Sequence, residues 1–167
     1  AFSYHGGFAL ALAAACSSVE ALDVSADAVA TIASNALKNR LPHVQAREAN
    51  AFDELRRLEK AGARYETVVL DPPAFARSKK AVPHAIAGYK EVNLRGLRLL
   101  QPGGVLVTCS CSQPITDDDF WKMLQAAARD ARRQIRLLEQ RGQGPDHPVL
   151  AGMPETRYLK CYLVQVF

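Results

Sequence analysis

The sequence predicts an α/β protein built around one mostly parallel, doubly wound sheet. Short apolar runs typical of buried strands alternate along the chain with longer segments that have the pattern of helices. Two of these runs end in polar motifs, Asp71-Pro72-Pro73-Ala74-Phe75 and Thr108-Cys109-Ser110-Cys111-Ser112. In such sheets ligands bind beyond the carboxyl ends of the strands. The 167 residues, 49% of them hydrophobic, suffice for one domain with a packed core.

Five segments have the length and the boundary residues of helices. A glycine pair precedes the first, and Ser25 is a suitable N-cap for the second, whose end is followed by Pro42. Gln101–Gly104 follows the fourth segment and contains a glycine suited to the C-cap. We expect helices at 8–16, 26–39, 52–60, 83–100 and 117–131.

Six segments have the length and the pattern of strands. They cover residues 19–23, 44–47, 65–70, 105–109, 135–139 and 158–167. No helix separates the last two, so we expect these two strands to pair antiparallel. A glycine loop that opens a first helix normally follows a strand. We therefore expect this sequence to lack its first strand and to be a fragment of a longer protein.

The composition limits the classes of function. The net charge of +4 and the sequence pI of about 9.0 are compatible with a polyanionic partner. The four cysteines have neither C-x-x-C nor Cys/His zinc spacing, which predicts no metal site and a reduced, cytoplasmic protein. No apolar run approaches the roughly 20 residues that span a bilayer.

The first half of the chain carries candidate cofactor-binding residues. Gly6-Gly7 before a helix lets a ligand approach the backbone, although an ordinary loop explains the pair equally well. Asp23 lies roughly 16 residues further on, where an acid meets ribose hydroxyls or simply caps a helix. Asn50 and Phe52 follow the third strand, where they either contact an adenine or begin the next helix.

The second half carries candidate reactive residues. Asp71 lies on a turn that Pro72 and Pro73 make rigid, and Phe75 could stack on a base; the alternative is a structural turn with a buried Phe. A thiolate at Cys111 could attack that base, although free cysteines are more often buried hydrophobes. If the two strands are neighbours, an acid and a thiol face the same crevice, and that pairing suits chemistry on a nucleobase.

Several motifs in order resemble those of the class I S-adenosylmethionine-dependent methyltransferases, specifically the 23S rRNA methyltransferase I type that makes 5-methylcytosine. The N-terminal residues Phe2-Ser3-Tyr4-His5-Gly6-Gly7-Phe8 are similar to F-x-Y-T-G-G-F, and Leu22-Asp23-Val24-Ser25 to V-D-x-S. The remaining matches are Asp71–Phe75 to D-P-P-K-F, Gly88–Asn93 to G-Y-K-D-I-N, Ser110–Ser112 to S-C-S, Asp146–Pro148 to D-H-P and Tyr158–Lys160 to Y-L-K. Asn50 stands where the family usually has an acid, and Ala74 where it has a lysine.

The resemblance implies a Rossmann-like, seven-stranded sheet in the order 3-2-1-4-5-7-6, with strand 1 largely missing here, and an RNA-binding PUA domain upstream. It implies S-adenosylmethionine as cofactor and Cys111, rather than Cys109, as the nucleophile. The expected catalytic residues of this chain are Cys111 and Asp71. The cofactor residues are Tyr4, Gly6, Gly7, Phe8, Asp23, Ser25, Asn50, Phe52 and Asp71. The substrate residues are Pro72, Pro73, Phe75 and Tyr89.

The predicted function is therefore methylation of C5 of a cytosine in 23S ribosomal RNA through a covalent cysteine adduct. Two alternatives stay open: an N-directed methyltransferase acting on guanine or adenine, and a non-catalytic fragment that binds cofactor or RNA. We expect no membrane partner, and the sequence leaves open whether the protein is a homodimer.

Overall fold

The computed structural model describes all 167 residues and confirms an α/β fold. The helices are α1 Gly7–Ala13, α2 Ala26–Lys38, α3 Ala51–Lys60, α4 Val82–Leu99 and α5 Asp117–Ala131, with short 3-10 helices at Lys79–Ala81 and Pro154–Thr156. The strands are β1 Val19–Asp23, β2 Val44–Glu48, β3 Tyr65–Leu70, β4 Leu100–Ser110, β5 Ile135–Arg141 and β6 Lys160–Val166. The chain forms two compact units, Ala1–Arg57 and Leu58–Phe167.

The first unit contains a two-stranded parallel sheet, β1 with β2, in register from Val19↔Val44 to Asp23↔Glu48. Small side chains dominate the core that α1 and α2 form with these strands: Ala9, Ala13, Ala21, Ile32, Ala36 and Val44. Ser25 has the predicted capping role, because its Oγ accepts a hydrogen bond from the backbone N–H of Ala28 at the start of α2.

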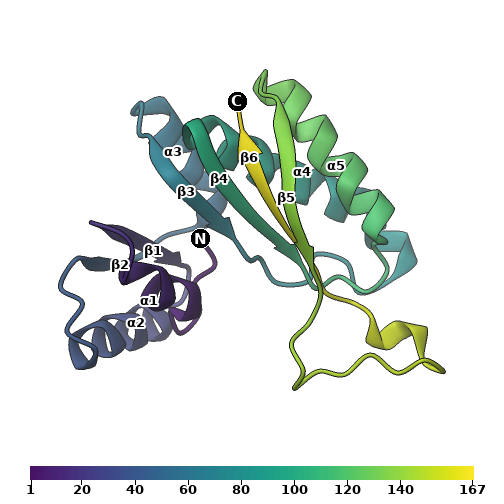
Figure 1. Cartoon of the computed structure of the whole chain (residues 1–167), viewed down its shortest axis with the longest axis horizontal. Coiled ribbons are helices and arrows are strands. Elements are labelled where there is room, and N and C mark those ends of the chain that lie inside the picture. Colours follow the sequence, from purple (N-terminus) through teal and green to yellow (C-terminus); the bar gives the residue numbers. More distant parts are fainter. The chain divides into compact units, whose positions relative to one another are not determined.

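The second unit contains a four-stranded sheet in the order β3-β4-β6-β5. Strands β3 and β4 pair in parallel, and β6 lies between β4 and β5 and is antiparallel to both, which confirms the expected pairing of the last two strands (Figure 1). Helices α4 and α5 pack side by side (Figure 1). Gly96 lets α4 approach the sheet closely, because a Cβ there would lie 3.0 Å from Leu70 Cδ1. The seven-stranded order remains a prediction.

The junction between α4 and β4 differs from the prediction. The fourth helix ends at Leu99, and its C-cap is Leu100 in an extended conformation, so the expected glycine C-cap is wrong. Strand β4 begins at Leu100, and its register with β3 shifts where Tyr65 pairs with Leu100 and Thr67 with Val105. This irregular pairing requires a glycine at position 104, because a Cβ there would lie only 2.9 Å from two backbone oxygens.

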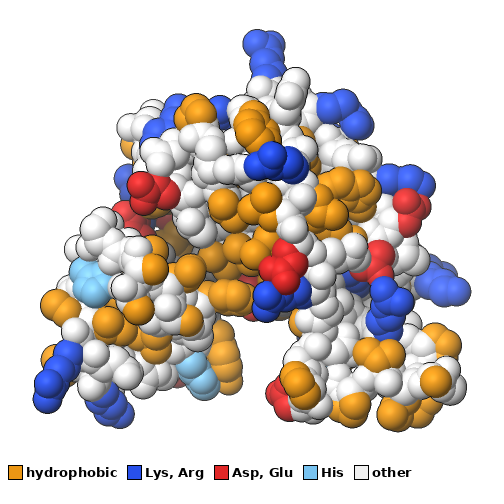
Figure 2. All heavy atoms as spheres, viewed as in Figure 1, with side chains coloured by type: hydrophobic (Ala, Val, Ile, Leu, Met, Phe, Trp, Pro, Cys, Tyr) orange, Lys and Arg blue, Asp and Glu red, His pale blue; other side chains and the backbone are white.

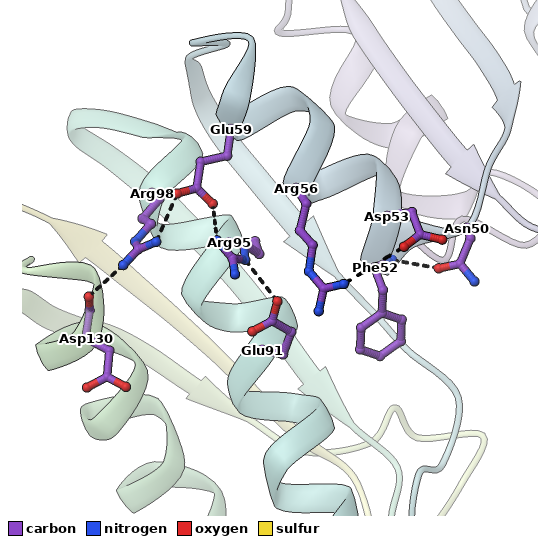
Figure 3. A network of polar contacts seen from close by, with 9 residues as sticks. All are labelled: Asn50, Phe52, Asp53, Arg56, Glu59, Glu91, Arg95, Arg98 and Asp130. Carbon is purple, nitrogen blue, oxygen red and sulfur yellow. Dashed lines mark hydrogen bonds and ion pairs between the residues drawn. The ribbon is translucent and has the colours of Figure 1, made fainter.

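Ion pairs fasten the end of α3 to α4, and a hydrogen bond links α4 to α5 (Figure 3). The Glu59 carboxylate accepts hydrogen bonds from Arg95 at 2.6 Å and Arg98 at 3.0 Å. Arg95 also bonds Glu91, and Arg98 donates to the backbone oxygen of Asp130. Burial opposes ionisation of Glu59, but these two guanidinium groups hold its pKa below the usual value.

The long loop between β5 and β6 exposes apolar side chains, seen in orange at the lower right of Figure 2. Val149, Leu150 and Met153 are all exposed there. Leu150 and Met153 form an isolated antiparallel bridge, and the backbone N–H of Leu150 donates to Thr156 Oγ1 at 2.9 Å. No helix of the chain combines the length and the hydropathy needed to cross a membrane.

Candidate active site

Backbone geometry shapes the loop that precedes α1. Phe2 and Tyr4 have positive φ angles of 61° and 45°, a left-handed conformation that few residues other than glycine adopt. Two hydrogen bonds hold the loop against the end of β1: Ser3 N donates to Leu22 O at 3.0 Å, and Tyr4 N donates to Asp23 Oδ2 at 2.8 Å. Such strained conformations cluster at ligand-binding sites.

Asp23 ends β1 and receives main-chain hydrogen bonds at both carboxylate oxygens. Besides the bond from Tyr4, Oδ1 accepts from Ser25 N at 3.0 Å. Each carboxylate oxygen has a second acceptor site, so the half-buried side chain can still accept hydrogen bonds from a ligand's hydroxyl groups. The loop and the first turn of α2 therefore hold an anionic acceptor in one orientation.

The two glycines at the start of α1 have different surroundings. Gly6 is the N-cap with φ 86°, and a Cβ on it would lie 3.2 Å from Ile32 Cγ1. A Cβ on Gly7 would meet no atom within 4 Å. Gly6 is therefore required by the backbone, whereas Gly7 leaves open space beside a main chain that a ligand can approach. The side chains of Tyr4 and Phe8 are exposed.

Asn50 and Phe52 stand at the start of α3 (Figure 3). The Asn50 Oδ1 atom accepts a hydrogen bond from Phe52 N at 2.9 Å, which is the helix-start role considered as the alternative. The Phe52 ring packs edge-on against Phe2, with the centroids 6.3 Å apart. Phe2 was not among the predicted site residues, and its only signal was its place in the first motif.

The residues of Ala1–Arg57 thus fit a nucleoside-bearing cofactor. An oriented carboxylate at Asp23 can accept ribose hydroxyls, and the open face of Gly7 admits close contact. The aromatic side chain of Phe52 and the amide of Asn50 supply the groups that a purine ring would use. Ser25 supports this arrangement, because its Oγ caps α2 and its backbone N–H donates to the Asp23 carboxylate.

In Leu58–Phe167, the acid motif and the thiol motif lie at adjacent strand ends, as predicted. Leu70, the last residue of β3, pairs with Thr108 of β4, so Asp71 and Cys111 both follow neighbouring strands. The thiol of Cys111 donates a weak hydrogen bond to the backbone oxygen of Pro72, with sulfur and oxygen 4.0 Å apart. The side chain of Asp71 is exposed, yet desolvation by the atoms around it raises the pKa of its carboxyl.

The two cysteines of the motif have different environments. Cys109 is 4% exposed and lies directly opposite Cys161 on β6. A hydrogen bond with the Cys161 thiol, together with burial, raises the pKa of Cys109. Cys111 is half-buried. Burial and the charge of Asp71 raise the pKa of Cys111, while the charge of Lys160 lowers it. Cys111 is thus the more accessible thiol.

Ser112, the residue after Cys111, is buried and links two other segments through hydrogen bonds. Its Oγ accepts a hydrogen bond from Ala76 N at 3.0 Å and lies 3.0 Å from the Tyr89 hydroxyl. Tyr89 is fully buried and packs against the Phe75 ring, with centroids 4.5 Å apart. Tyr89 therefore supports the loop from the core, and direct contact of Tyr89 or Phe75 with substrate remains a prediction. Pro73 is exposed, and Pro72 is buried.

Sequence reasoning gave no role to Ser112 or Lys160, whose only signals were their places in the S-C-S and Y-L-K motifs. Lys160 is 3% exposed, and its ammonium donates to three backbone carbonyl oxygens.

His147 lies in the exposed loop after β5, where Nδ1 is 3.3 Å from the Tyr158 hydroxyl and Nε2 is 3.6 Å from Asp146.

Comparison with known proteins supplies the family. A profile described as S-adenosylmethionine-dependent methyltransferase matches residues 1–161. This chain belongs to that family. S-adenosylmethionine is accordingly its cofactor, in agreement with the prediction, and the donor and acceptor groups of Ala1–Arg57 fit it.

The chain is similar to proteins named ribosomal RNA large subunit methyltransferase I. It is 40% identical to the one from Enterobacter sp. (strain 638) over 99% of this chain and 42% of that protein. It is also 40% identical to the one from Shewanella frigidimarina (strain NCIMB 400), over 99% of this chain and 43% of that protein. The chain thus spans about two fifths of the length of the curated relatives that it matches.

Solved structures confirm the Rossmann-like methyltransferase fold. An S-adenosylmethionine-dependent methyltransferase from Streptococcus mutans matches with a TM-score of 0.84 at 20% identity, over 98% of this chain and 43% of that chain. The methyltransferase SMU.776, solved in complex with SAH, matches with a TM-score of 0.83 at 21% identity over the same shares of both chains. At these identities the likeness concerns the fold alone.

Proposed function

We propose that this chain catalyses S-adenosylmethionine-dependent methylation of C5 of a cytosine in 23S ribosomal RNA, with Cys111 as the covalent nucleophile. The observation that carries the proposal is the position of a half-buried thiol at the end of β4, in contact with the Asp71-Pro72-Pro73 turn at the end of β3. The names of relatives that are 40% identical support ribosomal RNA as the substrate.

In this proposal the first unit holds the cofactor, which supplies the methyl group. Asp23 accepts the ribose hydroxyls, and the backbone at Gly6 and Gly7 lies against the cofactor. Asn50 and Phe52 contact the adenine edge and face. Tyr4, Phe8 and Ser25 complete the set of cofactor residues. The support is the oriented carboxylate and the open glycine face described above.

The second unit carries out the chemistry on the base. The thiolate sulfur of Cys111 forms a bond to C6 of the cytosine as the C5–C6 double bond becomes a single bond, which makes C5 nucleophilic toward the methyl group. After methyl transfer the C5 proton leaves to a base, the C5–C6 double bond re-forms, and the thiolate of Cys111 is released. Asp71 hydrogen-bonds the base edge and favours the protonated form of the base. Pro72, Pro73 and Phe75 define the position of the base.

The decisive experiment compares Cys111→Ala with Cys109→Ala. Methyl transfer from labelled S-adenosylmethionine to unmodified 23S rRNA is measured, together with cofactor affinity by calorimetry. We expect Cys111→Ala to lower the rate on the order of 10³-fold or more while the affinity is unchanged. Cys109→Ala should retain activity, because Cys109 is buried against Cys161. Full activity in Cys111→Ala would exclude the covalent mechanism.

One observation favours keeping an N-directed methyltransferase as the second candidate. The pKa of the Cys111 thiol is raised by burial and by Asp71, which disfavours the thiolate that a C5 mechanism needs. An Asp-Pro-Pro-x-Phe turn could instead hold an exocyclic amino group of guanine or adenine. Nucleoside analysis of the methylated RNA separates the two, since 5-methylcytosine and N-methylated purines are distinct products.

A further inference from the structure

Lys160 is a buried lysine whose ammonium is fully hydrogen-bonded. It is the first residue of β6 and is 3% exposed. Its Nζ atom donates to Ser112 O at 2.7 Å, to Ile115 O at 2.7 Å and to Tyr158 O at 2.8 Å. Three donors therefore meet three acceptors, which is the complete capacity of an ammonium group.

Two of these carbonyl groups belong to the segment that directly follows Cys111. Ser112 and Ile115 bound the turn between β4 and α5, and Ile115 N also donates to Ser112 O at 3.2 Å. Both residues are buried. One side chain on β6 thus closes this turn and fixes the backbone that leads away from the thiol.

The charge of Lys160 acts on the same thiol. Burial lowers the pKa of Lys160, whereas Asp117 and Asp119 of α5 and the Cys111 thiol favour its charged form. The effect is mutual: the Lys160 charge lowers the pKa of Cys111, against burial and Asp71, which raise it. Among these groups, Lys160 is the cation that opposes Asp71 at Cys111.

We propose that Lys160 is a positioning residue for Cys111, which holds the turn at residues 112–115 and stabilises the thiolate through its charge. This inference rests on the proposed role of Cys111. It assigns to the Y-L-K motif a function in nucleophile activation and places that function on a strand distant in sequence from the thiol.

The test is the pH dependence of Cys111 alkylation by iodoacetamide in the full chain, read for each cysteine by mass spectrometry. Lys160→Gln keeps hydrogen-bond donors but removes the charge, so the pH of half-maximal reactivity of Cys111 should rise by about 1. Lys160→Arg keeps the charge and should shift it far less. Lys122→Gln removes an exposed charge of α5 in the same unit and should leave it unchanged. An unchanged profile in Lys160→Gln would overturn the proposal.

A second measurement needs no variant. Acetic anhydride should label the exposed Lys79 and Lys80 of the native chain while Lys160 stays unlabelled. Labelling of Lys160 at a rate equal to theirs would also overturn the proposal. Alkylation reports on the thiol without methyl transfer. Failure of the proposed function, seen as activity in Cys111→Ala, is thus distinguishable from failure of this inference.

Discussion

The two units hold their candidate site residues by different means. In Ala1–Arg57, main-chain groups orient the site: the N–H groups of Tyr4 and Ser25 bind Asp23, and positive φ angles shape the loop. In Leu58–Phe167, buried side chains orient it: the Ser112 hydroxyl and the Lys160 ammonium each join several segments.

This difference determines which substitutions each unit tolerates. A site built from main-chain geometry depends on glycines and on one acid, because the backbone sets the conformation at Gly6 and orients the carboxylate of Asp23. A site built from buried polar side chains loses stability with any partner, since the remaining groups stay desolvated and unpaired. Substitution of the oriented acid in the first unit should therefore change ligand affinity, and substitution of the buried polar side chains in the second should change folding.

Ser112→Ala should give the largest loss of stability. It leaves the buried Ala76 N–H without its acceptor and the buried Tyr89 hydroxyl without its hydrogen-bond partner, at a cost of about 2–4 kcal/mol in the free energy of unfolding. Urea unfolding followed by the fluorescence of Trp121, the single tryptophan, reports on this unit. Ser78→Ala is the matched control, because Ser78 is exposed and its side chain caps nothing. Equal stabilities would mean that the junction is not held by Ser112.

Asp23→Asn should weaken cofactor binding while affecting stability less than Ser112→Ala does. Loss of the charged acceptor is expected to raise the dissociation constant of S-adenosylmethionine on the order of 10- to 100-fold. Calorimetry measures this, with Glu20→Gln on the same strand as control, since Glu20 pairs with Arg47 at the surface. If the two variants bind equally well, Asp23 does not contact the cofactor.

Local sequence signals predicted most of the fold. The bounds of 19–23 and 65–70 were confirmed, because apolar runs and punctuating polar residues mark such strands. The start of β4 was wrong, because its irregular pairing depends on β3 and not on the Gln101–Gly104 segment alone. A segment such as residues 101–104, with the composition of a turn, can either end a helix or form an irregular strand. Pairing with the neighbouring strand β3 determines which of the two forms.

The candidate site was predictable where topology alone brings residues together. Asp71 and Cys111 were expected side by side if their strands are neighbours, as the family resemblance implied, because the ends of neighbouring parallel strands share one edge; the pairing of β3 with β4 confirms this. Ser112 and Lys160 were missed because their partners lie far away in sequence: Ala76 is 36 residues from Ser112, and Lys160 is 48. The S-C-S and Y-L-K motifs mark these positions, but no local pattern shows that the serine and the lysine will be buried by distant segments.

The pair Gly6→Ala and Gly7→Ala separates folding from binding within the first unit. Gly6 has φ 86° and faces Ile32, so an added methyl group should lower the free energy of unfolding by about 1–2 kcal/mol. Gly7 is helical with open space around it, so the same methyl group should leave stability equal or slightly higher.

Gly7→Ala should keep its stability but lose affinity for the cofactor. If the open face of Gly7 contacts the cofactor, the methyl group displaces the ligand, and calorimetry should show weaker binding by a protein of undiminished thermal stability. Unchanged affinity would place the cofactor elsewhere and would leave Gly7 as an ordinary first residue of α1. Because the two glycines are adjacent and the added group is identical, any difference between the variants comes from backbone conformation and surroundings alone.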